Sequence, residues 1–455
     1  MERGNSFYLN SQSSWESNAR SYPRKIPIAI TWAKGIMVRD ADGKSYYDCL
    51  SGAGTLALGH NHPVVIEAMQ ETLRSGLPLH TLDLTTPMKQ QFVEELFQCL
   101  PSKFANRAKI QFCGPTGADG VEAAIKLVKT ATGRRNMMSF HGGYHGMTNG
   151  ALSLTGNLSP KQHVANLMPD VQFMPYPYNY RCPFGVGGDE GHRIGSRYME
   201  HVLNDPESGI VRPAGMIIEV VQGEGGVIPA PVEWLREIRR MTCEREIPLI
   251  IDEVQTGLGR TGKMFAFEHA DITPDVLVLS KAIGGSLPLA VIIYDESLDQ
   301  WQPGAHAGTF RGNQLGMAAG IATIQFIKQN QIDKHAEKVG DLFQYQLVNV
   351  KSDTSCIGEV RGKGLMIGVE IVNKEGTPDH LGSYPAYPEL AKMIQQQCVS
   401  RGLIVELGGR YGSVVRFLPP LIITDEQVHD IIAIFHDAVT ASERAIISKL
   451  VEVLS

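Results

Sequence analysis

The chain has 455 residues, of which 43% are hydrophobic and 20% are charged, a balance typical of a folded globular protein and too apolar for a disordered one. Its 42 basic and 48 acidic residues give a net charge of −6, which argues against a general binder of nucleic acids or anionic membranes. No apolar run approaches the ~18 residues of a membrane-spanning helix, and the polar N-terminus lacks the apolar core of a signal peptide, so we expect a cytoplasmic protein.

The sequence shows no clear metal or disulfide chemistry. Its seven cysteines are scattered and no two have CxxC spacing, so we expect reduced thiols rather than disulfides or a zinc knuckle. Histidines pair at 60–62 and at 141–145, but no cysteine or carboxylate lies at ligand spacing from them. No metal site is therefore predicted.

Three segments are distinguished along the chain. Residues 1–55 form a mixed, polar N-terminal segment, 56–327 a large domain, and 328–455 a smaller C-terminal domain. Within the large domain, short apolar runs alternate with amphipathic stretches. The C-terminal domain begins with helical stretches, which are followed by strand-like runs at 360–372 and 402–418 and by a closing helix at 425–450.

Three short runs rich in β-branched residues, 215–219, 248–252 and 275–281, resemble buried parallel strands separated by helical crossovers. Each run ends in an ionisable residue, and ligands of open α/β sheets bind beyond the carboxyl ends of the strands. These patterns predict an α/β fold with a mostly parallel sheet covered by helices. A smaller α+β domain would be built from the C-terminal part and the N-terminal segment.

Residues 185–191 are rich in glycine and are interpreted as a flexible surface loop, because no helical pattern follows them. The aromatic residues just before this stretch lack the interleaved lysines of a nucleic-acid platform. We expect them to pack in the core or at a subunit contact.

The segment 114–120, Gly-Pro-Thr-Gly-Ala-Asp-Gly, opens a helix whose apolar positions begin at Val121. Free N–H groups and the positive end of the helix dipole would make this an anion site, with Thr116 as a further donor and Gly117 allowing close approach. The spacing matches neither GxxxxGK[ST] nor GxGxxG. A plain glycine turn with a helix cap fits this segment equally well.

Two further residues at strand ends suggest a specific cofactor. Asp252 would suit a protonated pyridine nitrogen, with Gln255 donating to a nearby phenolic oxygen, although a strand-end Asp more often caps the following turn. Lys281 directly follows Val-Leu-Val-Leu-Ser, where desolvation would lower its pKa and make it a Schiff-base amine. Together with the anion loop, these residues predict a pyridoxal-phosphate site.

The order of these motifs resembles that of the class III aminotransferases, which are pyridoxal-phosphate enzymes of fold type I. The resemblance covers about residues 35–423, and Asp252 and Lys281 are 29 positions apart, as in that family. Within the family, the segments 50–56, 59–63 and 80–87 are most similar to members that act on diaminobutyrate and 2-oxoglutarate. The further supporting motifs are Thr116-Gly-Ala, Tyr144-His-Gly, Glu219-Val-Val-Gln-Gly-Glu-Gly-Gly226 and Gly308-Thr-Phe-Arg-Gly-Asn313.

The resemblance implies roles for the matching residues. Lys281 would bind the cofactor covalently and move protons, and Asp252 would keep the pyridine nitrogen protonated. Tyr144 would stack on the ring with His145 behind it, and Glu219 would support the surroundings of Asp252 and the ring. The full set expected at the cofactor is Thr116, Gly117, Ala118, Tyr144, His145, Glu219, Asp252, Val254, Gln255, Lys281 and Thr309. The family's usual Glu in the phosphate loop is Asp119 here, which leaves that position without an implied role.

The same resemblance implies substrate-binding roles for Arg416 and Glu224, and Asp83 is a further candidate. Arg416 would grip the α-carboxylate of glutamate or 2-oxoglutarate, and Glu224 would pair with Arg416 when a diamine binds. Asp83 is the candidate for the donor's α-ammonium group, although it also fits an ordinary turn carboxylate. Thr309 would reach the cofactor phosphate of a neighbouring subunit, which implies a homodimer with shared active sites, or a tetramer.

The resemblance therefore implies transfer of the terminal amine of L-2,4-diaminobutyrate to 2-oxoglutarate by a ping-pong mechanism. Another donor, such as 4-aminobutyrate, ornithine or β-alanine, remains an alternative, because similar amines differ by only ~1–3 kcal/mol in binding. Racemase or mutase chemistry on the same scaffold is disfavoured by the pairing of Glu224 with Arg416. A non-enzymatic interaction protein is disfavoured by the intact Lys281 and Asp252.

Overall fold

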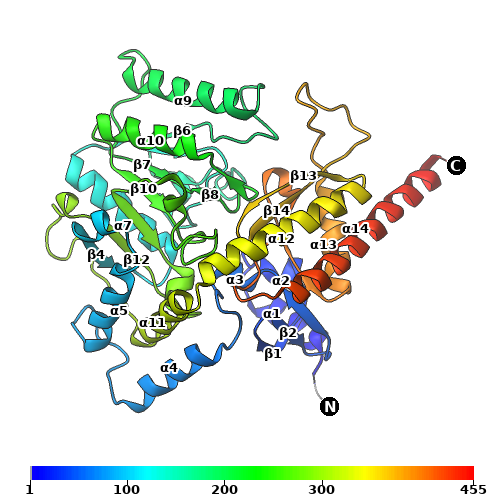
Figure 1. The fold of residues 1–455 in the computed structure, drawn as a ribbon, viewed down its shortest axis with the longest axis horizontal. Helices are drawn as coiled ribbons and strands as arrows, with labels where there is room; N and C mark the ends of the chain where they lie inside the picture. The colour runs from blue at the N-terminus through cyan, green and yellow to red at the C-terminus, as the bar shows by residue number, and fades with distance from the viewer. Residues whose placement is uncertain (1–2, 455) are drawn as a thin grey trace.

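A seven-stranded sheet forms the centre of the larger part of the computed structural model (Figure 1). The structure describes residues 3–454. Met1, Glu2 and Ser455, which belong to the predicted N-terminal segment and C-terminal domain, lie outside the described residues. Strand β12 is antiparallel to both of its neighbours, and the other strands run parallel to one another. In spatial order the strands are β4 (Ala108–Phe112), β12 (Val291–Asp295), β11 (Val276–Leu279), β10 (Leu249–Asp252), β7 (Gly215–Ile218), β5 (Met137–Phe140) and β6 (Val171–Met174).

The three predicted strands, β7, β10 and β11, are neighbours in this sheet and every residue in them is buried. Both faces of the sheet are covered by helices, which explains why these strands read as continuous apolar runs. Ile217, Ile250 and Val278 belong to the apolar cluster under α7 (Gly117–Thr132), whereas Ile218 and Ile251 belong to the main core on the opposite side. The predicted α/β fold is confirmed.

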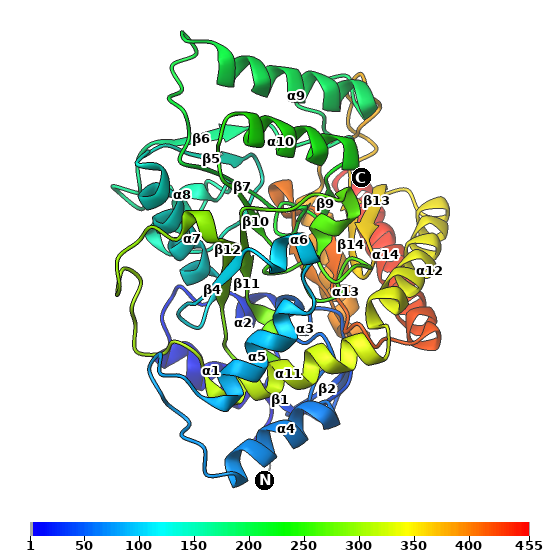
Figure 2. The ribbon, with the colours of Figure 1, turned by 60° about the vertical axis from the view of Figure 1, so that its left-hand side comes forward.

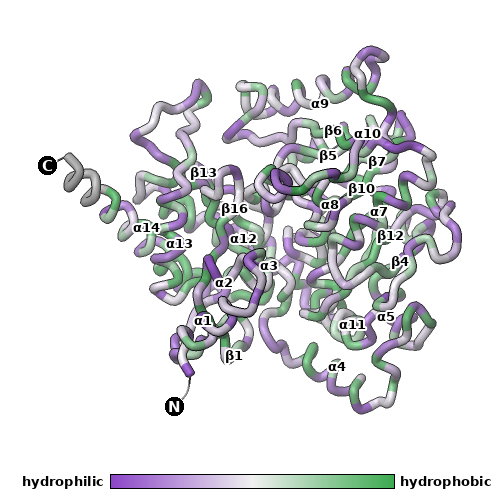
Figure 3. The backbone as a smooth tube through the Cα atoms, turned by 180° about the vertical axis from the view of Figure 1, so that it is seen from behind, coloured by the Kyte–Doolittle hydropathy of each residue, from purple (hydrophilic) through white to green (hydrophobic). Residues whose placement is uncertain are grey.

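The helices are arranged around this sheet (Figure 2). Hydrophobic stretches gather in its strands, and the loops on the outside are largely hydrophilic (Figure 3). No helix within residues 3–454 is long and apolar enough to cross a membrane. Besides α7, the elements of this part are α4 (Pro63–Arg74), α5 (Pro87–Phe97), α6 (Ser102–Ala105), α8 (Asn149–Leu154), α9 (Gly188–Asn204), β8 (Val221–Gln222), β9 (Ile228–Pro229), α10 (Val232–Glu244), η1 (Ala266–Ala270), η2 (Lys281–Gly284), η3 (Glu296–Leu298) and α11 (Gln314–Gln329).

The smaller part contains two further sheets. One is antiparallel, in the order β13 (Ile357–Lys363), β14 (Met366–Ile371), β17 (Val414–Phe417) and β16 (Glu406–Gly408). The other joins both ends of the chain, in the order β1 (Ile30–Lys34), β2 (Met37–Asp40), β3 (Ser45–Asp48) and β15 (Leu403–Ile404). The remaining elements are α1 (Asn5–Trp15), α2 (Tyr22–Lys25), α3 (Ser51–Gly54), α12 (Ile332–Asp353), α13 (Pro388–Ser400), η4 (Arg410–Gly412) and α14 (Asp425–Leu454).

The second sheet confirms that the N-terminal segment and the C-terminal part build one smaller α+β unit, because β3 pairs in parallel with β15. The limits drawn at residues 55 and 327 stay a prediction. The interpretation of residues 185–191 as a loop is wrong for its second half, since α9 begins at Gly188. Two of the buried positions of α9 are Gly191 and Gly195, so the apolar period that announces a helix is missing from the sequence.

Close packing of α11 on η2 fixes the backbone just after Lys281. A Cβ added to Gly320 in α11 would lie 2.1 Å from the carbonyl oxygen of Ile283. We expect Gly320→Ala to lower the free energy of unfolding by about 2–4 kcal/mol, because backbone must shift to make room. Gly316→Ala in the same helix is the matched control: its nearest neighbour would be 3.5 Å away, so stability should be unchanged or slightly raised. Denaturant unfolding measures both, and equal losses would contradict the packing argument.

Candidate active site

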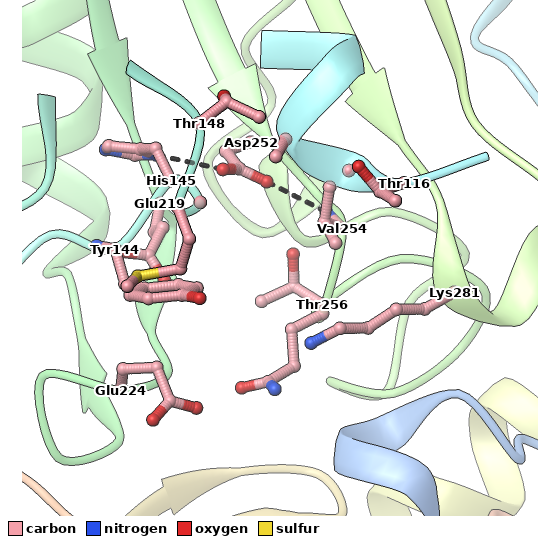
Figure 4. Close-up of a pocket in the computed structure, with 15 residues that line it drawn as sticks. Thr116, Tyr144, His145, Thr148, Glu219, Glu224, Asp252, Val254, Thr256 and Lys281 are labelled. Carbon is pink, nitrogen blue, oxygen red and sulfur yellow. Dashed lines mark hydrogen bonds and ion pairs between the residues drawn. The ribbon is translucent and has the colours of Figure 1, made fainter. Parts of the chain in front are cut away.

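The carboxyl ends of β7, β10 and β11 open into a cavity of about 480 Å³ (Figure 4). Glu219, Asp252 and Lys281, which follow or end these strands, all line it. Most of the predicted site residues therefore come together at one place. The complete lining is Thr116, Gly117, Ala118, Tyr144, His145, Gly146, Met147, Thr148, Glu219, Glu224, Asp252, Val254, Gln255, Thr256 and Lys281.

Lys281 extends its amine into this cavity (Figure 4). Its backbone has φ of 51°, a left-handed conformation that is uncommon outside glycine, at the point where β11 gives way to η2. Burial lowers the pKa of the Lys281 amine, and the nearby Glu224 carboxylate only partly opposes this effect. A lysine with a lowered pKa has a larger fraction of neutral, nucleophilic amine at physiological pH.

Asp252 is held by a histidine that the sequence did not connect to it. The Nδ1 atom of His145 lies 2.8 Å from Oδ2 of Asp252, and both residues are buried. Oδ1 of Asp252 accepts the N–H of Val254 at 3.1 Å. Because both oxygens are tethered, the carboxylate has a fixed orientation at the cavity wall, as a partner for a cationic nitrogen requires. The sequence implied only that His145 lies behind Tyr144.

The predicted anion loop lies at the N-terminus of α7, where Thr116 is the capping residue and its hydroxyl accepts the N–H of Asp119. Gly117 is tightly placed, since a Cβ there would lie 2.9 Å from both γ-carbons of Val254. Asp119 closes the loop through Arg311, at 2.6 Å, and His306, at 3.1 Å. The His306 hydrogen bond, with further help from Arg311, lowers the pKa of Asp119 despite its partial burial. Asp119 thus has a structural role, which the resemblance did not supply.

Glu219 braces two segments of the cavity wall. One carboxylate oxygen accepts the N–H of Tyr144 at 2.9 Å, and the other accepts the N–H of Gly223 at 3.0 Å. Burial raises the pKa of Glu219 to about 7, and the charge of Asp252 adds to this shift. Glu219 therefore positions the Tyr144 segment and the glycine-rich loop that carries Glu224.

Arg416 is fully buried beside the cavity and pairs with Glu224, whose Oε1 lies 2.6 Å from Nη1. The other terminal nitrogen donates to Oε1 of Gln255 at 3.0 Å. The amide nitrogen of Gln255 donates to the carbonyl of Ala53, so in this structure it serves the N-terminal segment. Although burial disfavours ionisation of Glu224, the guanidinium of Arg416 holds its pKa below the usual range. A second carboxylate, Glu406, lies 3.5 Å from Nη1 and was not anticipated from the sequence.

Two of the predicted residues lie outside this cavity. Thr309 is exposed and lines a separate cavity of about 420 Å³, where its carbonyl lies 3.1 Å from Nε2 of His80. Asp83 is also exposed and lines a third cavity with Lys89. Their roles stay predictions. Gly146, the last residue of the Tyr144-His-Gly motif, also lines the cavity, and the lining residues that the sequence did not suggest are Met147, Thr148 and Thr256.

Comparisons with known proteins place this geometry in context. The family model for class III aminotransferases matches residues 18–439. The diaminobutyrate–2-oxoglutarate aminotransferase of Rhizobium meliloti (strain 1021) is 59% identical, covering 94% of this chain and 91% of the relative. The protein of the same name from Haemophilus influenzae is 51% identical, covering 96% of this chain and 95% of the relative.

Solved structures give the same fold. An amine transaminase from an uncultivated Pseudomonas species, in a PLP-bound form, has a TM-score of 0.83 at 26% identity and covers 94% of this chain and 98% of that one. The ornithine aminotransferase of Toxoplasma gondii has a TM-score of 0.81 at 24% identity, covering 98% of this chain and 96% of that one. The latter likeness supports the fold alone.

Proposed function

Because the chain belongs to the class III aminotransferases, we propose that it transfers the 4-amino group of L-2,4-diaminobutyrate to 2-oxoglutarate. The products are L-aspartate 4-semialdehyde and L-glutamate. The observation that carries this proposal is the identity of 59% and 51%, over nearly the whole chain, to two proteins named for this reaction.

Pyridoxal phosphate is the cofactor, and the residues in the cavity fit it. A nucleophilic lysine amine, a tethered carboxylate and a helix N-terminus surround one space, and Gly117 keeps the helix N-terminus open to a phosphate. When bound, the cofactor supplies an aldehyde for the amino group and a ring that withdraws electrons. Thr116, Gly117 and Ala118 would hold its phosphate. Tyr144 and Val254 would flank its ring, and Gln255 would face its phenolic oxygen.

The remaining residues have distinct tasks in the proposed reaction. Lys281 holds the cofactor and then accepts and returns protons at the substrate carbon, a task for which its lowered pKa suits it. Asp252 stabilises the positive charge on the ring nitrogen, and His145 keeps the Asp252 carboxylate in place. Glu219 positions Tyr144 and the Glu224 loop.

The site must accept a diamine and a dicarboxylic acid in turn. With the diamine bound, no substrate carboxylate neutralises Arg416, and Glu224 pairs with it as in the structure. When 2-oxoglutarate binds, its α-carboxylate takes the place of the Glu224 side chain, which is 35% exposed and has room to turn away. This exchange also disfavours racemase or mutase chemistry, since those reactions act on a single substrate and need no switch between two different acids.

A homodimer with shared sites is part of the proposal. Thr309 is exposed and outside the cavity of its own chain, so it is available to reach the cofactor phosphate of a second copy. Asp83 is exposed as well, so it is available to bind the α-ammonium group of the donor. We place the protein in the cytoplasm, a reducing compartment that suits its free cysteines.

Donor choice is tested by single-turnover absorbance of the cofactor-loaded protein without acceptor. We expect diaminobutyrate to convert the bound cofactor to its amine form at least about tenfold faster than ornithine, 4-aminobutyrate or β-alanine. Ornithine is longer by one methylene group, which is worth about 10–200-fold in such pockets, and the other two amines lack the α-ammonium group. Addition of 2-oxoglutarate should reverse the change. Equal or faster conversion by another amine would keep the reaction class and overturn the donor.

A further inference from the structure

Two carboxylates of different exposure flank the buried guanidinium of Arg416. Glu224 lies on a glycine-rich loop with 35% of its side chain exposed, whereas Glu406 lies in β16 with 4% exposed. Glu406 and Arg416 are directly opposite each other on the antiparallel strands β16 and β17. Glu406 is therefore fixed by the sheet, whereas the more exposed Glu224 side chain has room to turn away from Arg416 while its backbone stays in place.

Exchange of Glu224 for a substrate carboxylate passes through a state in which neither group contacts Arg416. A buried guanidinium without a counter-charge is strongly unfavourable. The Nε atom of Arg416 already lacks a hydrogen-bond partner among the described residues, so few other groups could compensate. Gln255 is the remaining partner of the guanidinium, and it is neutral.

We propose that Glu406 is a positioning residue which keeps Arg416 compensated while Glu224 departs, and so allows fast alternation between the diamine and the dicarboxylic acid. This inference rests on the proposed function, because only a two-substrate site needs the exchange. Glu406 acts through Arg416, without contacting substrate itself.

The charges around Glu406 agree with this role. Burial raises the pKa of Glu406, the Arg416 guanidinium opposes the shift, and the neighbouring Glu224 carboxylate adds to it. From α2, Lys25 and the hydroxyl of Tyr22, which hydrogen-bonds to Glu406, lower its pKa; Lys281 faces the group from the end of β11. When Glu224 leaves, its repulsion on Glu406 is removed, and Arg416 remains the nearest opposite charge to the Glu406 carboxylate.

The test measures the two half-reactions separately in Glu406→Gln. We expect the second-order rate constant for 2-oxoglutarate to fall at least about tenfold, because the exchange state loses the second of the two carboxylates that residues 3–454 place against Arg416. The diaminobutyrate half-reaction should change less than about threefold, since Glu224 stays paired throughout it. Calorimetry measures the equilibrium affinity for glutarate, an unreactive dicarboxylate. This affinity should also change less than about threefold, because Glu224 in the free protein and glutarate in the complex occupy the same place beside residue 406.

Two further variants separate this role from a merely structural one. Glu370→Gln, in β14 of the same sheet, removes a buried carboxylate paired with Arg361 rather than Arg416, and should affect both half-reactions alike. In a Glu224→Gln background no ion pair has to break, so adding Glu406→Gln should no longer slow 2-oxoglutarate. Equal slowing of both half-reactions by Glu406→Gln, or slowing that persists in the Glu224→Gln background, would overturn the proposal. A wild-type protein inert to diaminobutyrate would instead refute the proposed donor, and the 2-oxoglutarate rates would still decide the role of Glu406.

Discussion

Replacement of Lys281 by alanine should abolish transamination, with both half-reactions slowed at least about 10³-fold, because a positioned acid–base group alone contributes 10²–10⁴-fold. Lys281→Arg should be equally inactive. The guanidinium keeps the positive charge but cannot lose its proton in a protein, and the task requires a neutral amine. Half-reaction absorbance and steady-state assays measure the loss.

Covalent trapping provides a readout that does not depend on turnover. After borohydride reduction, mass spectrometry should find the cofactor on the peptide that contains Lys281, and on no peptide of the two variants. Lys103→Ala is the control, because this exposed lysine lies outside the cavity and should be neutral. Cofactor trapped elsewhere with activity retained would refute the assignment of Lys281.

Asp252→Asn should slow both half-reactions by about 10²–10³-fold, the typical loss when a preorganised electrostatic partner is removed. The amide oxygen can still accept from His145, and the fold is expected to survive the loss of the Val254 hydrogen bond, but the neutral side chain no longer stabilises a protonated ring nitrogen. The cofactor should still bind, since its phosphate contacts and Lys281 are intact. Absorbance titration measures binding, and the half-reactions measure the loss.

The matched control for Asp252 is Asp275, which comes just before the neighbouring strand β11 and pairs with Arg239. Asp275→Asn removes an ion pair at the opposite end of the strands. Because the pair is part-buried and bidentate, and Asp275 also accepts the N–H of Leu249, the variant should lower stability by about 1–3 kcal/mol with unchanged half-reactions. Comparable kinetic losses in both variants would show that Asp252 acts only through stability.

The fold and the cavity floor could be predicted because their signals are local. Each of β7, β10 and β11 is a continuous apolar run that ends in, or is followed by, an ionisable residue, and strand ends of a parallel sheet meet at one edge. The pairing of Arg416 with Glu224 was implied by resemblance, and the structure brings the two together at 2.6 Å.

The parts that sequence reasoning missed depend on contacts between distant residues. His145 and Asp252 are 107 positions apart, and Asp119 and Arg311 are 192 apart, so no spacing rule connects them. The sequence does not identify Glu406 as a partner of Arg416, because the two residues come together only through the register of β16 on β17. The helix α9 was missed for a different reason, since glycines stand where apolar side chains normally reveal the period.

The pairing of β3 with β15 has a consequence for how the chain acquires its structure during synthesis. Tyr47 and Asp48 find their strand partners at Leu403 and Ile404, more than 350 residues later. During synthesis, the edge of β3 that pairs with β15 therefore stays without its partner until almost the entire polypeptide has left the ribosome. The central sheet, whose strands all lie between Ala108 and Asp295, can pair in the meantime, but the main hydrophobic core is completed only when residues as late as Val439 join it.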